Sequence, residues 1–277
     1  MLLVSACGSK APPPSSAPQG QWISIFNGQN LDGWTAKIAG HAVGENYADT
    51  FRVENGILRI AYDKYGQFGE QFGGLYYKDK FSHYWIRVEY RFVGDQAAGA
   101  PAWAVRDSGI FLHAQSPNSM QKDQQFPVSL ELNMLGASFR GRPTGDVCTN
   151  GGVTIVVNGA KLTDKCTRMS STTMRGDQWV TAEAEVKGGT SIKHYVNGQL
   201  IVEYQQPQLS SSDPDSARLL AAGANAQIID GYIGLESNGH PVEFRKIEIL
   251  PLDTPTANVV TDAPSEATGN SSEHSGS

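Results

Sequence analysis

Two stretches near the middle of the chain carry polar side chains at every second position. An extended strand over residues 107–115 would place these residues on one side: Asp107, Gly109, Phe111, His113 and Gln115. A strand over residues 128–134 would place Ser129, Glu131 and Asn133 on one side and apolar residues on the other. These polar positions contain no lysine, unlike a typical solvated face. We therefore expect carboxylate, imidazole and amide groups to converge on one concave surface.

Glu131 and His113 are the members of this set best suited to proton transfer near neutral pH. Each residue also has an ordinary structural explanation. A single strand histidine commonly makes structural hydrogen bonds, and Glu131 could be an exposed carboxylate on an alternating strand. A second carboxyl group would complete an acid and base pair with Glu131, and Asp107 and Glu236 are the candidates for it.

An aromatic ring exposed beside these polar groups could stack on the apolar face of a ring-shaped ligand. Trp103 follows Gly99, Pro101 and Ala102, a loop composition that exposes a side chain. Trp103 is therefore the expected stacking residue. Three other tryptophans are expected in the core: Trp34, Trp85 and Trp179.

The elements that must hold these residues are short strands. Residues 51–61 and 191–204 each contain an Asn-Gly pair between alternating runs, the strongest short-range signal for a hairpin. Residues 84–92 and 180–186 alternate in the same way. No stretch has the apolar spacing of a long helix, so helices should be short and few. This pattern predicts an all-β fold of two packed antiparallel sheets.

The chain of 277 residues divides into one foldable region and two tails. All-β domains of about 200–250 residues commonly remain single, so we expect one domain over residues 21–251. Residues 252–277 are rich in Thr, Ser, Pro, Asn and Glu, which predicts a disordered tail. The net charge is −6, and four acids lie in this tail, so the folded part is nearly neutral. Without a basic face, nucleic acid is not an expected partner.

Residues 1–7 end in Val-Ser-Ala-Cys, which resembles the end of a bacterial lipoprotein signal with Cys7 as the acylated residue. The apolar run is too short to span a bilayer. Residues 8–20, rich in Pro, Ser and Ala, then form a flexible linker. These features predict a protein of the bacterial cell envelope whose membrane contact is limited to a lipid anchor. A chance apolar N-terminus with an unmodified Cys7 is the alternative.

Cys148 and Cys166 lie in a segment of loops and β-branched residues. An exported protein meets oxidising conditions, so we expect a disulfide between them, which would contribute roughly 3 kcal/mol by chain entropy. Two buried free thiols are the alternative. Two cysteines without a CxxC pair make a poor zinc site.

The sequence resembles the 3-keto-disaccharide hydrolase family, above all in two runs. One run is Ile25-Phe-Asn-Gly-Gln-Asn-Leu-Asp-Gly-Trp34. The other spans residues 231–250, which alternate about a Gly-His-Pro turn as a half-buried strand pair would. The resemblance covers residues 22–251. It implies a jelly-roll sandwich of the concanavalin A type, and an enzyme that cleaves glycosides whose sugar carries a ketone at C3.

The two polar strands share in this resemblance. Family members also have a Ser-Gly-Ile/Val-Phe/Met-Leu/Ile strand, followed by a strand with Glu in a Leu-Glu-Leu position, here Glu131. In closer relatives the first strand continues into His-Gly-Gln-Ser-Pro, and Ala114 replaces the glycine here. Asp107 stands where those relatives usually have Asn, so no charge role carries over to it.

A 3-keto sugar allows cleavage by elimination, because the ketone acidifies the proton on C2. A base removes that proton, the enolate expels the C1 substituent, and water adds to the resulting glycal. We expect Glu131 and His113 to take the base and acid roles, and Arg106 and Gln115 to polarise or orient the ketone. The other residues expected to bind substrate are Trp103, Asp107, Asn133, Glu236 and His240.

No cofactor is evident, and the sequence shows no tight metal-binding spacing. A divalent metal could still replace the polarising donor, with ligands from this set: His113, Glu131, Asp107 and His240.

A non-catalytic carbohydrate-binding module on the same fold is the alternative function, because one fold serves lectins and enzymes alike. An adhesion or scaffold protein is a third interpretation, but the sequence lacks the repeats expected of one. Glu131 and His113 on one face favour the enzyme.

Overall fold

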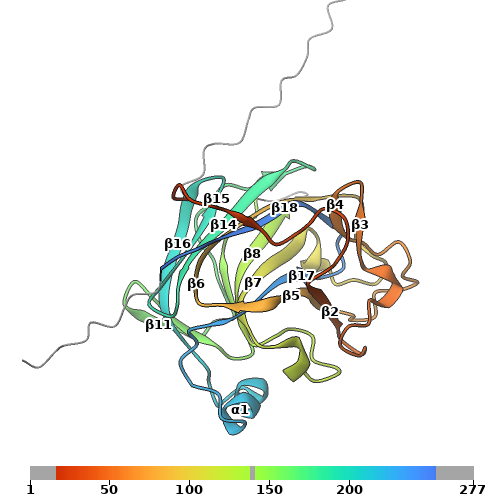
Figure 1. Ribbon diagram of the computed structural model, residues 1–277. Coiled ribbons are helices and arrows are strands. Elements are labelled where there is room, and N and C mark those ends of the chain that lie inside the picture. The colour runs from red at the N-terminus through yellow and green to blue at the C-terminus, as the bar shows by residue number, and fades with distance from the viewer. Residues whose placement is uncertain (1–16, 138–140, 254–277) are drawn as a thin grey trace, which may run out of the picture.

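The computed structural model describes residues 17–137 and 141–253. Its strands form two almost entirely antiparallel sheets that pack on one another (Figure 1), which confirms the predicted all-β jelly-roll sandwich. Cys7 and most of the two tails lie outside the described residues, so the lipid anchor, the disordered tail and the domain limits stay predictions. No helix in the described ranges is long and apolar enough to cross a membrane.

The strands of the first sheet follow one another in this order: β11 (Ala160–Leu162), β10 (Thr154–Val157), β16 (Gln199–Gln208), β15 (Ser191–Val196), β14 (Val180–Lys187), β6 (His83–Phe92), β18 (Val242–Pro251), β4 (Ile57–Ile60) and β3 (Phe51–Glu54). β1 (Ile23–Ser24) also pairs with β18.

The strands of the second sheet have this order: β12 (Cys166–Thr167), β9 (Val147–Asn150), β8 (Ser129–Ala137), β7 (Asp107–Ala114), β17 (Gly231–Ser237), β5 (Gly73–Phe81) and β2 (Trp34–Ile38). β13 (Met174–Arg175) lies parallel to β8. Helices in the described ranges are short, as expected: α1 (Pro214–Ala221) and 3-10 turns at Tyr47–Asp49, Ala102–Ala104 and Pro117–Ser119.

The apolar core lies between the sheets, and strand alternation decides which side chains enter it. Ile110 of β7 and Leu130 and Leu132 of β8 pack in one apolar cluster with Val88 of β6. Successive side chains of a strand point to opposite faces. The odd-numbered residues of β8, and those of β7 as far as Phe111, therefore stand on the outer face of the second sheet. We call this the site face.

Both Asn-Gly pairs form the predicted hairpin turns. Asn55 and Gly56 join β3 to β4, and Asn197 and Gly198 join β15 to β16. All four residues have positive φ, between 48° and 78°. Two successive positive φ angles are typical of a type I′ turn, whose twist matches that of the flanking strands.

The run at residues 231–250 forms two strands, as predicted, but they do not pair with each other. β17 pairs with β5 and β7 in the second sheet, whereas β18 pairs with β6 and β4 in the first. Residues 238–241 carry the chain between the sheets. Strands of opposite sheets alternate just as hairpin partners do, because each buries one face in the same core. The alternation therefore could not distinguish the two arrangements.

Candidate active site

Three neighbouring strands bring carboxyl groups together on the site face. β7 and β8 pair with Phe111 opposite Glu131 and Gly109 opposite Asn133. β17 lies on the other side of β7, and its Glu236 pairs with Gly74 of β5. Because Glu236 is two residues after Gly234, which is opposite Phe111, its side chain shares the face of Glu131.

These carboxyl groups are buried although they lie outside the main core. The exposed fraction is 7% for Asp107, 4% for Glu131 and 3% for Glu236. Acidic residues are rarely this buried unless they are paired or serve a function. The cluster is therefore the first candidate for a reactive site.

Glu131 and Glu236 form a directly contacting pair. Their carboxyl groups interact directly, and Asn150 Nδ2 donates a hydrogen bond to Glu131 Oε2 at 2.9 Å. Burial raises the pKa of Glu131 to about 7, assisted by the charge of Asp107 and opposed by the Asn150 hydrogen bond and the charge of Lys165. Glu131 therefore changes its protonation state close to neutral pH.

Glu236 remains protonated to higher pH than an ordinary carboxyl group. Burial raises its pKa well above the usual value, and the charges of Glu131 and Asp107 raise it further. Two like charges in contact cannot both be stable in a buried site. Glu236 is therefore the member of the pair that retains its proton more strongly, and its Oε2 has no hydrogen-bond partner among the described residues.

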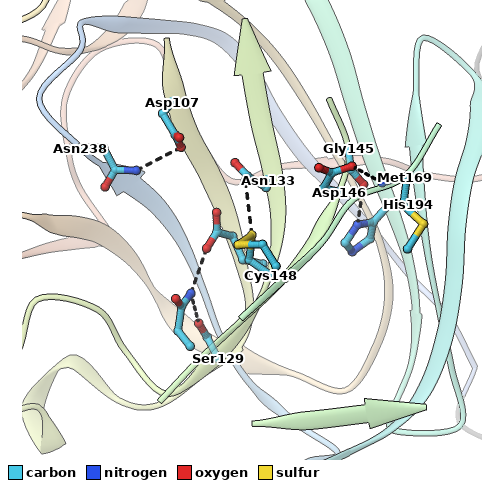
Figure 2. Close-up of a disulfide and its surroundings, with 12 residues drawn as sticks. Asp107, Ser129, Asn133, Gly145, Asp146, Cys148, Met169, His194 and Asn238 are labelled. Carbon is cyan, nitrogen blue, oxygen red and sulfur yellow. Dashed lines mark hydrogen bonds between the residues drawn. A yellow bond between two sulfur atoms is a disulfide. The ribbon is translucent and has the colours of Figure 1, made fainter. Parts of the chain in front are cut away.

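Asp107 is held at the edge of the cluster by a cation and an amide. Arg142 Nη2 donates to Asp107 Oδ2 at 2.7 Å, and Asn238 Nδ2 donates to Asp107 Oδ1 at 3.3 Å. Figure 2 shows Asn238 directed at Asp107, with Asn133 nearby. Burial raises the pKa of Asp107 to about 6, although Arg142 opposes the shift. Asp107 thus keeps its charge at neutral pH while its two partners fix its orientation.

Glycines on β7 and β5 leave room for the side chains of the site face, and the Glu131 side chain lies across β7 over one of them. A Cβ atom at Gly109 would stand only 2.5 Å from Glu131 Oε1. A Cβ at Gly74 would come within 3.1 Å of the Phe111 ring. A side chain at Gly109 would displace the Glu131 carboxyl group, and one at Gly74 would press on the Phe111 and Tyr76 rings, so both glycines are needed for this packing.

Aromatic rings form a rim beside the carboxyl groups. Trp103 is 51% exposed and stacks on Phe72, with ring centroids 5.4 Å apart. Phe72 in turn contacts Phe126 at 5.3 Å, and the Lys165 ammonium lies 4.7 Å from the Phe126 ring centroid. Trp34 and Trp85 are buried, as expected. Trp179 is only half-buried, because it lies between the guanidinium groups of Arg91 and Arg245 on the first sheet.

A polar cavity of about 520 Å³ opens next to this rim. Phe126, Lys165 and Asn150 line it, together with Asp123 and Asp213. Since Asn150 also binds the Glu131 carboxylate, the cavity adjoins the reactive pair. A ligand bound there would contact the same amide that orients Glu131.

His113 does not share the site face, and the expectation that it lies with Glu131 is wrong. Its φ is 51°, and two residues of β7 oppose one of β17 between Phe111 and Ala114, which is a β-bulge. Beyond the bulge Ala114 takes the site face and packs with Phe111. His113 turns inward, where Nε2 donates to the Gly188 carbonyl oxygen at 3.1 Å.

The inward position also changes the acidity of His113. Its ring contacts that of Tyr84 edge to face, and burial lowers its pKa to about 4. His113 is therefore neutral at physiological pH. Its contacts with the Gly188 carbonyl oxygen and the Tyr84 ring do not connect it to the carboxyl cluster.

Three other predicted residues also lie away from the carboxyl cluster. Arg106 points away from the carboxyl cluster and donates hydrogen bonds to Gly176 O and Asp177 Oδ1, each at 2.8 Å. Gln115 orders the loop after β7, because its Oε1 accepts a hydrogen bond from Val128 N at 2.7 Å. His240 packs against Phe92, and burial lowers its pKa to about 4.

The ligand set suggested for a metal is consequently not assembled. His113 and His240 are separated from Glu131 and Asp107, for the reasons given above. Among the described residues no group of three or more His, Cys, Asp and Glu side chains is placed to hold a metal ion. The expected disulfide is present, and it joins Cys148 on β9 to Cys166 on β12.

Sequence reasoning missed four residues of the site: Arg142, Asn150, Lys165 and Asn238. Asn238 had a usable signal, because it is two residues after Glu236 and follows the same strand. Asn150 also ends an alternating stretch that pairs with the strand of Glu131. Arg142 and Lys165 lie in loops without periodicity, and only the folded chain brings them to the carboxyl groups.

Comparison with known proteins gives the family of the chain. Residues 21–250 match the family described as 3-keto-alpha-glucoside-1,2-lyase-like domain. A search of curated proteins found no match.

Solved structures show distant likenesses. A protein from Parabacteroides distasonis ATCC 8503, provisionally described as a glycosyl hydrolase, has 15% sequence identity and a TM-score of 0.48, covering 84% of this chain and 94% of that chain. A Bacillus subtilis protein of unknown function with a galectin-like fold has 10% identity and a TM-score of 0.46, covering 80% and 90%. The carbohydrate-binding module CBM66 from Bacillus subtilis has 9% identity and a TM-score of 0.37, covering 84% and 98%.

The family match spans nearly all of the described chain, including every strand that carries a site residue. The chain therefore belongs to the family of 3-keto-alpha-glucoside-1,2-lyase-like domains, and its function is related to carbohydrates.

Proposed function

We propose that this protein cleaves 3-keto-glycosides by removing the proton on C2, eliminating the C1 substituent and adding water to the resulting glycal. The observation that carries this proposal is the buried pair of Glu131 and Glu236 on the site face, in which burial raises the pKa of both carboxyl groups. Membership of the family supports the proposed substrate class. The pair supplies a base and an acid at one place.

Glu131 is the proposed base. A general base works best when its pKa lies near the operating pH, and burial brings the pKa of Glu131 to about 7. Asn150 holds one of its carboxylate oxygens. The other oxygen, Oε1, lies over Gly109 and is the proposed acceptor of the C2 proton.

Glu236 is the proposed acid for the leaving oxygen. Its raised pKa keeps the proton on the carboxyl group until the leaving group needs it. His113, which sequence reasoning placed in this role, is neutral and faces the core. Glu236 thus replaces it in the scheme.

The closeness of the two carboxyl groups favours elimination over ordinary glycoside hydrolysis. Carboxyl groups that flank a glycosidic bond stand about 5–5.5 Å apart in retaining enzymes and about 6.5–9.5 Å apart in inverting enzymes. Glu131 and Glu236 stand on the same face of one sheet and interact directly, so they do not lie on opposite sides of a bound glycosidic bond. Adjacent groups suit proton transfers at two neighbouring atoms, C2 and the C1 oxygen.

Several groups are available to bind the sugar. The exposed Trp103 ring can stack on a pyranose face, and Asn133 Oδ1 and Asn238 Oδ1 are buried acceptors without a partner among the described residues. Sugar hydroxyl groups would satisfy both amide oxygens. The enolate also needs a cation at the C3 oxygen, and Arg142 and Lys165 are the cations nearest the carboxyl groups.

The proposal predicts that a 3-keto-disaccharide is cleaved, whereas its unoxidised parent is not. Only the ketone makes the C2 proton acidic enough for a carboxylate to remove. Release of free sugar from each compound, measured by chromatography under identical conditions, tests this. Cleavage of the parent alone would refute the proposal, and binding of either sugar without cleavage would favour a carbohydrate-binding module.

A further inference from the structure

The disulfide lies inside the candidate active site. Cys148 stands directly opposite Glu131 in the pairing of β8 with β9. Asn133 Nδ2 donates a hydrogen bond to Cys148 Sγ at 3.3 Å, so one amide contacts both the site face and the disulfide (Figure 2). The bond from Cys148 to Cys166 thus ties the strand beside Glu131 to the next segment of chain.

That next segment carries Lys165, the residue before Cys166. The chain leaves β11 in the first sheet, passes through exposed residues 163–166, and joins the second sheet only in the two-residue strand β12. Besides that pairing, the Lys165 carbonyl oxygen accepts a hydrogen bond from Thr149 N at 2.7 Å. The covalent bond at Cys166 is therefore the strongest tie that keeps the Lys165 backbone at this edge.

From this backbone position the Lys165 side chain reaches the site. Its ammonium lies against the Phe126 ring and lines the same cavity as Asn150, which holds the Glu131 carboxylate. Arg142, the other nearby cation, already donates to Asp107 and to the carbonyl oxygens of Trp103 and Val105. Among the described residues the Lys165 ammonium has only its ring contact with Phe126, so all three of its donors can serve a ligand.

We propose that Lys165 is the cation that receives the C3 oxygen of the substrate, and that the disulfide between Cys148 and Cys166 is the element that positions it. This inference rests on the proposed function and deepens it. The disulfide then does more than stabilise the fold, because breaking it frees the segment that carries Lys165. Turnover is lost while the sandwich, whose core lies on the other side of the sheet, remains folded.

The charge of Lys165 gives this proposal a measurable signature. The groups that act on the ionisation of Glu131 are Asp107 on β7, Glu236 on β17, Asn150 on β9 and Lys165 before β12. A positive charge favours the ionised carboxylate, so Lys165 lowers the pKa of Glu131. Removing or displacing that charge raises the pKa of Glu131. Because Glu131 must be ionised to act as a base, the acidic limb of the kcat/KM profile then moves to higher pH.

The kinetic test compares Lys165→Met with the paired variant Cys148→Ser and Cys166→Ser. We expect each to lower kcat/KM for a 3-keto-disaccharide at least tenfold and to move the acidic limb up by about half a unit to one unit. We also expect the combined triple variant to resemble the paired variant, because both changes remove the same charge. Lys165→Arg keeps the charge, so the acidic limb of the kcat/KM profile should stay at the same pH. Lys161→Met removes a charge from exposed β11 and should change neither kcat/KM nor the pH of this limb.

A second readout does not depend on activity. The pKa of Glu131 is measured by carbon-13 NMR of labelled glutamate carboxyl groups, with Glu131→Gln identifying the signal. Reduction by dithiothreitol converts the disulfide to two thiols, with the reagent becoming a cyclic disulfide, and provides the same comparison if the paired serine variant does not fold. We expect the pKa of Glu131 to rise after Lys165→Met and after reduction.

The outcomes separate this inference from the proposed function. An unchanged Glu131 pKa after both Lys165→Met and reduction, in protein whose circular dichroism is unchanged, would overturn the role of Lys165. A raised pKa after Lys165→Met but not after reduction would retain Lys165 and overturn the positioning by the disulfide. Absence of cleavage in the unmodified protein would instead count against the proposed function, while the NMR comparison still decides the placement of Lys165.

Discussion

Replacing Glu131 with glutamine should lower kcat for a 3-keto-disaccharide by about 10²–10⁴, the usual cost of losing one general base. Glutamine keeps the size of the side chain and can still accept the hydrogen bond from Asn150. It cannot accept the C2 proton. Substrate binding should therefore survive, because the stacking ring and the amide groups are untouched.

The measurement is kcat by sugar release, together with the substrate dissociation constant by calorimetry on the slow variant. Glu203→Gln is a matched control, because Glu203 is an exposed carboxylate on β16 of the first sheet. It should leave both quantities unchanged. A Glu131→Gln variant with near-normal kcat would remove Glu131 from the mechanism.

Replacing Glu236 with glutamine should have an effect that depends on the leaving group. A sugar alkoxide leaves poorly without a proton, so we expect a loss of about 10²–10⁴ with a 3-keto-disaccharide. A 4-nitrophenolate leaves without protonation, so the loss with a 4-nitrophenyl 3-keto-glucoside should be less than about tenfold. Glutamine fits the site because its amide can still donate to Glu131, which preserves the pair.

Comparison of the two substrates separates an acid from a structural residue. A structural defect would depress both rates by the same factor. Equal losses with the sugar and the nitrophenyl leaving groups would therefore contradict the acid role of Glu236. Glu131→Gln should show the opposite behaviour, with large losses for both substrates, because each of them must lose its C2 proton.

Much of the fold could be predicted because strand alternation is a local property. Residues 84–92 and 180–186 alternate in the sequence and form β6 and β14, and each Asn-Gly pair marks a real hairpin. The sequence did not indicate to which of the two sheets a strand belongs. β17 and β18 alternate like partners although they lie in opposite sheets.

The site could be predicted only where alternation continues unbroken. Glu131, Asn133 and Asp107 reach the site face because β8 and the first half of β7 are regular. His113 does not, because one residue with positive φ produces a bulge and reverses the faces that follow. Nothing local distinguishes His113 from a residue in a regular strand.

The cations of the site depend on contacts between distant segments. Arg142 binds Asp107, which is 35 positions earlier in the sequence. The charge of Lys165 acts on Glu131, and Lys165 precedes Cys166, whose disulfide partner is 18 positions away. Loops have no period from which the direction of a side chain can be inferred. The sequence therefore indicated Arg106 as the polarising cation, because it precedes the strand that became β7. In the structure Arg106 points away from the carboxyl cluster.

The central claim is that cleavage begins with removal of the C2 proton, and cleavage in deuterium oxide tests it most directly. The released 3-keto sugar is analysed by mass spectrometry and proton NMR at early times, with the product alone incubated in parallel to correct for exchange after release. Elimination followed by addition of water predicts deuterium at C2 of the released sugar, because the proton taken up by Glu131 exchanges with solvent before C2 is protonated again. Release of a 3-keto sugar that retains its original hydrogen at C2 would contradict the account.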